Sequence, residues 1–306
     1  MVEMLSSDEK IVQICDPAYR KLDVLAYITD FCGYGCWYCY NRVIGPRKHI
    51  NLAELAGFAR RVKTVTTRDL ELELIGGEPS VHPDIEEFCG DACQFSSVVM
   101  YTNLGRDSGL YRRLANLGVR FDISYHEPDA KRNAKVLENI DTIPKSSIRG
   151  ITVMLDKSRF DDNVRIFYEL KTRYPDIDVD FQQIIIGSEL DSYSDEQLAK
   201  MAQMTGTEPH GDFQIKTNRR TMNVSHNQIY EITRQKYKRW LCSAGVDLLY
   251  VHVDGKVYRC DGYFNGRMPS IGDIRGGIRL PSHPSVCEVE NCPFQDNVTK
   301  RNVFGL

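Results

Sequence analysis

Three cysteines lie close together in the segment Cys32-Gly-Tyr-Gly-Cys36-Trp-Tyr-Cys39. The two glycines between the first and second cysteines free the backbone to wrap around a metal centre. Three thiolates at this spacing can ligate three irons of a cubane [4Fe–4S] cluster and leave the fourth iron open to a small molecule. A zinc knuckle is the alternative, but structural zinc normally has four ligands, and the nearest further candidate is His49. The spacing therefore favours an iron–sulfur cluster with one open iron.

Four more cysteines occupy the C-terminal part of the chain: Cys242, Cys260, Cys287 and Cys292. The turn signal Asp254-Gly255 predicts a hairpin over residues 248–259, which would bring the first two of these cysteines together. Four thiolates can ligate a second [4Fe–4S] cluster completely, and they can equally close a structural zinc site. If one cysteine of the last pair is free, the second cluster would have an open iron as well.

Of the ten cysteines, three remain outside these two groups. Cys89 and Cys93 are four residues apart on an expected helix, so we interpret them as small core residues. Cys15 is a candidate donor of a hydrogen atom to a substrate radical. The N-terminal residues lack the apolar run of a signal peptide, so we expect a cytoplasmic protein whose clustered thiols are metal ligands rather than disulfides.

The composition excludes some classes of partner. The chain has 306 residues, of which 42% are hydrophobic, and a formal net charge of −3. We therefore expect no nucleic-acid partner, and no apolar run approaches the roughly 20 residues of a membrane span. Basic residues at 216–220 and 234–240 are interpreted as a solvated face rather than as contacts to RNA or an anionic substrate. Tyr230, Tyr237 and Trp240 are expected to pack.

Between residues 22 and 186, strand-like runs alternate with helix-like segments. The strands are expected at Leu22–Thr29, Asp69–Ile75, Ser97–Thr102, Val119–Tyr125, Ile148–Leu155 and Asp178–Ile186. The helices are expected at Asn51–Lys63, Asp84–Cys93, Asp107–Leu117, Asp129–Ile140 and Asp161–Arg173. Such βα repeats predict an α/β fold with a parallel sheet. Six strands are too few for a closed eight-stranded barrel, so we expect an open partial (β/α)6 barrel.

This architecture brings the chemistry-bearing residues to one rim, because ligands bind at the C-terminal ends of parallel strands. The cysteine triad follows the first expected strand, and Gly76-Gly77-Glu78-Pro79 follows the second. We expect a domain plan with an N-terminal extension (1–21), the partial barrel (22–186), a polar connecting segment (187–240) and a small Cys-rich domain (241–306).

With the triad, further motifs in the first 185 or so residues resemble the radical S-adenosylmethionine (SAM) superfamily. Tyr38 is the aromatic residue that precedes the last cysteine of the family signature. Gly76-Gly77-Glu78 resembles the GGE motif, which meets the amino group of SAM. Thr102-Asn103 resembles the T-N-G element, with Leu104 in place of the glycine, and Ser124-Tyr125-His126 resembles the S-x-H form.

The resemblance implies a mechanism and roles for these residues. SAM would bind the open iron. One electron from the cluster would then cleave SAM to a 5′-deoxyadenosyl radical, which would abstract a hydrogen atom from the substrate. Glu78 would pair with the SAM ammonium, the backbone around Tyr38 would contact the adenine, and Asn103, Ser124 and His126 would face the ribose or carboxylate. An electron donor such as flavodoxin or ferredoxin is implied.

The C-terminal cysteines resemble a SPASM/twitch extension, and four of them fit the shorter twitch type with one auxiliary [4Fe–4S] cluster. The chain would then hold two clusters and act as an oxidoreductase or an epimerase. The auxiliary cluster would accept the second electron of an oxidation, whereas an epimerase needs a hydrogen donor.

The substrate would be a small molecule, such as a sugar or aminocyclitol, or a peptide, which indicates a role in natural-product or peptide maturation. About 21 residues precede the first barrel strand, which is too short for a leader-binding domain and favours the small molecule. A tRNA-modifying radical SAM enzyme and a non-enzymatic zinc-stabilised binding module are the alternatives.

Overall fold

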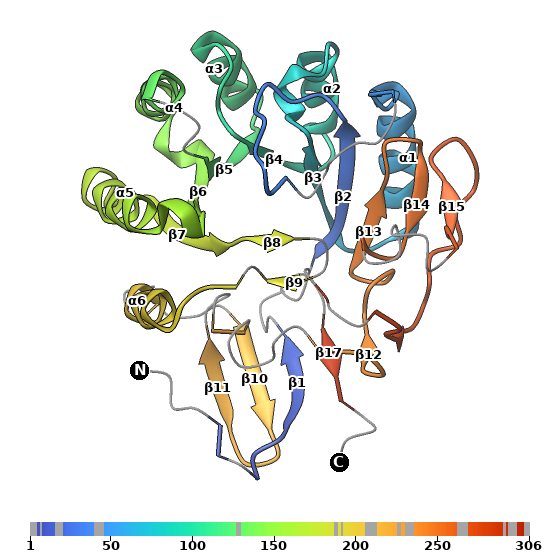
Figure 1. Cartoon of the computed structure of the whole chain (residues 1–306). Coiled ribbons are helices and arrows are strands. Elements are labelled where there is room, and N and C mark those ends of the chain that lie inside the picture. Colours follow the sequence, from blue (N-terminus) through green and yellow to red (C-terminus); the bar gives the residue numbers. More distant parts are fainter. Residues whose placement is uncertain are drawn as a thin grey trace.

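The computed structural model describes residues 5–6, 8–15, 21–39, 46–126, 130–186, 189–190, 192–205, 213–224, 228–229, 236–261, 269–289, 292 and 299–302. Its main feature is a nine-stranded sheet in the order β15-β14-β13-β2-β3-β4-β5-β6-β7. Helices cover the outer face of this curved sheet (Figure 1). The sheet has two free edges, β15 and β7, so the barrel is open, as the sequence predicts.

The six expected barrel strands are present and pair in parallel, in chain order. They are β2 (Lys21–Thr29), β3 (Asp69–Gly76), β4 (Ser97–Thr102), β5 (Arg120–Tyr125), β6 (Ile148–Leu155) and β7 (Asp178–Gln183). The five expected helices are also present, as α1 (Leu52–Val65), α2 (Ile85–Ala92), α3 (Ser108–Asn116), α4 (Ala130–Thr142) and α5 (Phe160–Arg173). The structure thus confirms the α/β partial barrel, and the expected start of α4 at residue 129 lies outside the described residues.

Two predicted strand boundaries were wrong for local reasons. Val119 donates its N–H to the Leu114 carbonyl (3.1 Å), so it still belongs to the end of α3 rather than to β5. Ile184 donates its N–H to the Tyr193 hydroxyl (2.9 Å), which ends β7 early. The residues that follow form β8 (Ile185–Ile186), which pairs with β9 (Glu189–Leu190) in a separate hairpin.

Apolar and polar residues alternate along several strands, and the apolar ones pack into the core. Leu70, Leu72 and Leu74 of β3 are buried against the helices, in the same cluster as the apolar face of α1. That helix begins where the sequence predicts, because the Asn51 side chain accepts a hydrogen bond from the Glu54 N–H (3.1 Å). The alternate residues of β3 point to the inner face of the sheet.

The predicted C-terminal hairpin is present as β13 (Leu248–Val251) and β14 (Lys256–Tyr258), with Gly255 at a positive φ of 86° in the turn. β13 pairs in parallel with β2, and β15 (Gly272–Asp273) pairs with β14. The proposed division at residue 241 follows a change in composition, whereas the hairpin itself continues the barrel sheet.

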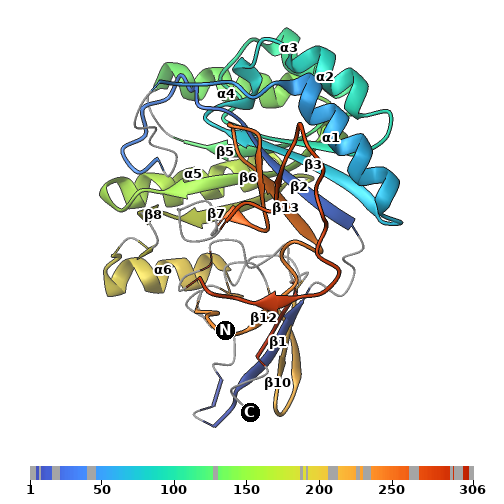
Figure 2. The same cartoon turned by 90° about the vertical axis from the view of Figure 1, so that its right-hand side faces the viewer.

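A second sheet joins the two ends of the described chain, in the order β11-β10-β1-β17-β12-β16. Its strands are β1 (Ile11–Cys15), β10 (Phe213–Thr217), β11 (Thr221–Val224), β12 (Leu241–Cys242), β16 (Ser285–Val286) and β17 (Lys300–Arg301). Figures 1 and 2 show this sheet below the barrel, with α6 (Asp195–Thr205) beside it. Within the described ranges, no helix is both long and apolar enough for a membrane crossing.

Candidate functional site

The glycine pair after β3 docks against the start of the cysteine loop. Gly77 donates its N–H to the Thr29 carbonyl, and Glu78 donates its N–H to the Phe31 carbonyl, both at 2.7 Å. A Cβ at Gly76, whose φ is +145°, would come within 2.5 Å of the Thr29 oxygen. A Cβ at Gly77 would overlap the Phe31 carbonyl. Only glycine permits this approach, so the pair fixes where the loop leaves β2.

Glu78 connects the ends of β3 and β4. Its side chain is 2% exposed, and its carboxylate accepts hydrogen bonds from the Ser80 N–H (3.1 Å), the Thr102 hydroxyl (2.7 Å) and the Asn103 N–H (2.7 Å). Burial raises the pKa of Glu78, although these three bonds act in the opposite direction. The Ser80 side chain also hydrogen-bonds to this carboxylate and lowers its pKa in the same way.

Asn103 connects the end of β4 to the first cysteine. Its side-chain Nδ2 donates to Cys32 Sγ (3.7 Å), and its Oδ1 accepts the Gly105 N–H (2.9 Å). The triad, the Gly-Gly-Glu motif and the Thr-Asn element are therefore joined by direct contacts at one rim of the sheet.

Leu104 stands where the resemblance expects glycine, and it keeps the backbone conformation that glycine favours. Its φ is +54°, in the left-handed region, which costs a residue with a Cβ about 1–2 kcal/mol. The side chain is fully buried, and the Asn139 side chain donates to the Leu104 carbonyl (2.7 Å). Burial and this bond together offset the backbone cost.

His126, after β5, lies beside the second cysteine of the loop and beside Tyr38. The Tyr38 hydroxyl lies 2.9 Å from His126 Nδ1, and Cys36 Sγ lies 3.7 Å from the same nitrogen. The two rings stack with centroids 6.0 Å apart. Burial lowers the pKa of His126 to about 4, so the imidazole is neutral at pH 7. Ser124, two residues earlier on β5, lies on the same inner face.

Tyr34 is a site residue that the sequence analysis missed. Its hydroxyl is buried and has no hydrogen-bond partner among the described residues. Burial raises the pKa of Tyr34 to about 12, and the Arg132 guanidinium lies 5.0 Å from the ring centroid. An unsatisfied buried hydroxyl costs about 1–3 kcal/mol, so this atom fits a site that is completed by a polar ligand. Its position between the glycines of the triad loop was the available signal.

His49, the candidate fourth ligand of a zinc knuckle, is engaged elsewhere. Its Nδ1 lies 2.9 Å from the Thr29 hydroxyl, and its ring stacks on Phe31 with centroids 4.5 Å apart. Burial lowers the pKa of His49, and the nearby His82 adds to the shift. These contacts hold the His49 ring against Thr29 and Phe31 rather than against the triad.

The four C-terminal cysteines form one buried group, each between 6% and 9% exposed. Cys260 interacts electrostatically with the three others, Cys292, Cys242 and Cys287. Burial and the neighbouring thiols Cys242 and Cys292 raise the pKa of Cys287 to about 11, against the lowering effect of a backbone hydrogen bond at Val289 and of Lys300. All ten cysteines are free thiols, which agrees with the expectation that they are not paired as disulfides.

The spacing of the sulfur atoms bears on which metal they would hold. Among the described residues, no three cysteine sulfurs lie within 4.8 Å of one another. Tetrahedral zinc with zinc–sulfur bonds of about 2.3 Å needs sulfurs about 3.8 Å apart. Both cysteine groups are therefore more widely spaced than a single zinc ion requires, and a cluster of several irons is the larger group.

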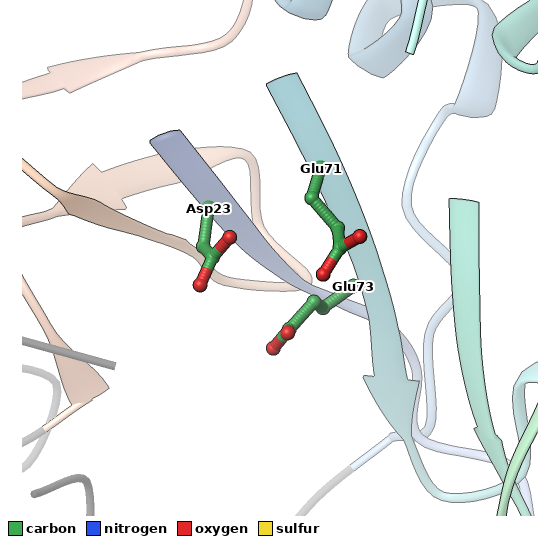
Figure 3. A group of neighbouring side chains, drawn as sticks. All are labelled: Asp23, Glu71 and Glu73. Atoms are coloured by element: carbon green, nitrogen blue, oxygen red, sulfur yellow. The ribbon is translucent and has the colours of Figure 1, made fainter. Parts of the chain in front are cut away.

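A separate acidic group, which the sequence analysis did not identify, lies on the inner face of the sheet. Figure 3 shows Asp23 of β2 with Glu71 and Glu73 of β3, whose carboxylate oxygens lie within 4.8 Å of one another. Lys21 (2.7 Å), Arg120 (2.6 Å) and Arg149 (3.3 Å) pair with Glu71.

Burial raises the pKa of Glu73 well above its ordinary value, and Asp23 adds to the shift, although Arg149 opposes it. Asp23 precedes the rim residue Thr29 by six positions, or about 20 Å of strand, so this group is not part of the rim site.

The remaining predicted residues lie away from the rim. Cys15 is the last residue of β1 in the second sheet (Figure 1). Arg219 pairs with Asp8, and Arg220 pairs with Glu9 (2.9 Å), so these basic residues hold the N-terminal segment rather than a free anion site.

The aromatic residues near the connecting segment behave as predicted where the structure describes them. Tyr237 is fully buried and packs edge-on against Trp240, with centroids 5.3 Å apart, which confirms the packing prediction. Cys89 is likewise fully buried in the core. Tyr230 and Arg234 lie outside the described residues.

Comparisons with known proteins agree with this geometry. A GTP 3',8-cyclase of Pseudomonas putida (strain W619) is 30% identical over 170 residues, which are 49% of this chain and 50% of that protein. A GTP 3',8-cyclase of Pseudomonas entomophila (strain L48) is 34% identical over 127 residues, which are 39% of this chain and 37% of that protein. The chain thus spans half or less of the length of these curated relatives.

A similar fold occurs in the solved structure of native anSMEcpe with bound AdoMet, at a TM-score of 0.59 and 15% identity over 84% of this chain and 79% of that one. The structure of anSMEcpe with bound AdoMet and the Cp18Cys peptide gives a TM-score of 0.58 at 15% identity, over 84% of this chain and 78% of that one. Residues 26–157 match the family model of the radical SAM superfamily. This range holds the triad, the Gly-Gly-Glu motif, the Thr-Asn element and His126, so the match to the radical SAM superfamily covers the part of the chain that builds the rim site.

Proposed function

We propose that this chain is a radical SAM enzyme that abstracts a hydrogen atom from a small-molecule or peptide substrate. Cys32, Cys36 and Cys39 would hold the SAM-binding [4Fe–4S] cluster. When bound, the cluster and SAM supply the 5′-deoxyadenosyl radical, and the protein supplies binding, orientation and protection from solvent.

The main support for this proposal is the set of contacts that connects Asn103, Glu78 and the cysteine loop. Asn103 reaches Cys32 Sγ with its side chain and Glu78 with its N–H, and Glu78 reaches the start of the cysteine loop with its own N–H. A turn that merely ended a strand would not need to contact a thiol. This arrangement places the Glu78 carboxylate near the triad, where it would pair with the ammonium of SAM.

Two further groups support a SAM site at this rim. The Tyr34 hydroxyl needs a polar partner, and a ligand with hydroxyls and a carboxylate offers several. The neutral His126, held by Tyr38, can accept or donate a hydrogen bond without adding charge beside the thiolates. Ser124 on the same face adds a hydroxyl.

We also propose that Cys242, Cys260, Cys287 and Cys292 ligate an auxiliary [4Fe–4S] cluster. Their mutual proximity, their burial and the wide spacing of their sulfurs support a cluster over a single zinc ion. Such a cluster would accept the second electron if the reaction is an oxidation. In an epimerisation a hydrogen donor is needed instead, and Cys15 remains a candidate by residue type alone.

The test is anaerobic reconstitution of the full chain, followed by iron, sulfide and zinc analysis and a 5′-deoxyadenosine assay with flavodoxin or dithionite as the electron donor. We expect about eight irons per chain and SAM cleavage. Replacing the triad cysteines by alanine should remove about four irons and all 5′-deoxyadenosine. Zinc at both sites without SAM cleavage would overturn the proposal in favour of a zinc-stabilised binding module.

GTP is a second candidate substrate, because the curated relatives are named GTP 3',8-cyclase. An incubation with SAM and GTP, an aminocyclitol or a peptide would separate these classes. The candidate whose addition raises 5′-deoxyadenosine formation and yields a modified product is the substrate, and a response to none of them would exclude all three.

A further inference from the structure

A lysine side chain is buried at the centre of the second sheet. Lys300 of β17 is fully buried, with 0% of its surface exposed. Its neighbours across the ladder are Ile14 of β1 on one side and Cys242 of β12 on the other. The next residue of the same strand, Arg301, is exposed. The chain thus places one cation inside this sheet and the adjacent cation in solvent.

Four cysteines and an aromatic ring lie among the described neighbours of Lys300. Its ammonium interacts electrostatically with Cys292, Cys242, Cys287 and Cys260. The ammonium also lies 5.1 Å from the centroid of the buried Tyr237 ring. A buried charge is costly unless an opposite charge is close, and one aromatic face offsets only part of that cost. Ionised thiols at these four cysteines would place negative charge close to this ammonium.

We infer that Lys300 is the counter-ion of the auxiliary cluster and raises its reduction potential. The inference rests on the proposed cluster at the C-terminal cysteines. Four thiolates leave a [4Fe–4S] centre negatively charged, and its reduction by one electron adds a further negative charge. A fixed cation in a dry environment stabilises the reduced form more than the oxidised form. Lys300 is thus a positioning residue that makes the cluster a better electron acceptor.

The test uses the full chain with Cys32, Cys36 and Cys39 replaced by alanine, so that only the auxiliary cluster remains. In this background the potential is measured by anaerobic titration with dithionite, followed by electron paramagnetic resonance. We expect Lys300→Met to lower the reduced-to-oxidised ratio at a fixed potential at least tenfold, which is about 59 mV for a one-electron couple. Lys300→Arg keeps the charge, so its reduced-to-oxidised ratio should stay close to that of the parent.

Arg301→Met is the matched control, because it removes the same charge from the adjacent, exposed position of the same strand. At the same fixed potential, its reduced-to-oxidised ratio should stay within twofold of the parent's. Equal potentials in Lys300→Met and Arg301→Met at equal iron content would overturn the inference.

If Lys300→Met does not retain iron, Lys300→Gln provides a second neutral variant. Loss of iron in both neutral variants but not in Lys300→Arg would support the counter-ion role, and equal loss in all three would overturn it. Zinc in the triple-alanine parent would instead overturn the auxiliary cluster itself, so the two failures are distinguishable.

Discussion

Gly77 lies where the cysteine loop meets the end of β3, and its replacement tests how strictly the rim is built. We predict that Gly77→Ala lowers the iron bound by the triad severalfold and destabilises the chain by about 1–3 kcal/mol. The physical reason is that the new Cβ would meet the Phe31 carbonyl, which is backbone and cannot rotate away. Iron analysis and urea unfolding measure the two effects.

Gly57→Ala is the control for that variant. Gly57 is inside α1, and a Cβ there meets only the end of the Arg61 side chain at 3.5 Å. Because alanine favours a helix interior over glycine, this variant should stabilise the chain by about 0.5–1 kcal/mol and keep its iron. Similar behaviour of the two variants would contradict the docking role of Gly77.

Leu104 gives a second prediction at this scale, about the order of two variants. Leu104→Ala removes a buried side chain but keeps a Cβ at a φ of +54°, whereas Leu104→Gly also relieves the backbone. We expect both to be destabilised by about 2–5 kcal/mol, with the glycine variant the more stable of the two by about 1 kcal/mol. Thermal or urea unfolding of the pair is the measurement.

The same pair of replacements at Leu114 should give the opposite order. Leu114 is fully buried within α3, where glycine is less favourable than alanine by about 1 kcal/mol. If the glycine variant is less stable than the alanine variant at both positions, the left-handed backbone of Leu104 has no measurable cost.

At the scale of the element, β3 carries Glu71 and Glu73, two of the three acidic residues of Figure 3, and its other face forms part of the core. The pKa of Glu73 is raised by burial and by Asp23, so the folded chain holds this proton more tightly than the unfolded chain. Stability should therefore fall as pH rises above about 4.5 and through the folded pKa of Glu73. Glu73→Gln should flatten the fall in stability between pH 5.5 and 8, as measured by urea unfolding at several pH values.

Glu86→Gln is the matched control. Glu86 is half-exposed, and its hydrogen bonds with Arg113 lower its pKa, so it is ionised in both states over this range. The variant should leave the slope of stability against pH unchanged. A wild-type chain with the same slope as Glu73→Gln would contradict the raised pKa.

The elements also show why some features could be predicted and others could not. The alternation of Leu70, Leu72 and Leu74 predicts β3 correctly, because one face of that strand packs on helices. The same alternation gives no sign that Glu71 and Glu73 are buried, since charges opposite an apolar face usually lie in solvent. Curvature of the sheet encloses them, and curvature is set by all strands together.

The rim site was predictable to a similar degree. Strand ends and motif order predict that the triad, Glu78 and Asn103 lie together, and the structure describes contacts among them. The burial of the Tyr34 hydroxyl and the left-handed backbone of Leu104 could not be predicted, because both depend on the packed neighbours rather than on spacing.

At the scale of the whole molecule, the cysteine quartet lies among strands from both ends of the chain. β12 carries Cys242 and pairs with β17, which in turn pairs with β1. If the quartet holds a cluster, removal of iron from the chain whose triad cysteines are replaced by alanine should raise the rate of amide hydrogen exchange in β12, β17 and β1 at least tenfold. β4 and β5 serve as internal controls, since they lie within the barrel sheet.

Exchange that rises equally in β4 and β5 would show that the cluster supports the whole fold rather than the second sheet. No change in any strand would contradict a cluster at the quartet.

The pairing of β13 with β2 has a consequence for synthesis on the ribosome. Every strand from β2 to β7 has been synthesised once residue 183 is made, but the partner that covers the open side of β2 begins only at Leu248. At typical elongation rates, several seconds separate the two events. During that interval the nascent barrel exposes an unpaired strand edge beside a loop of three thiols. We therefore expect overproduction of the chain to require chaperones or a low growth temperature.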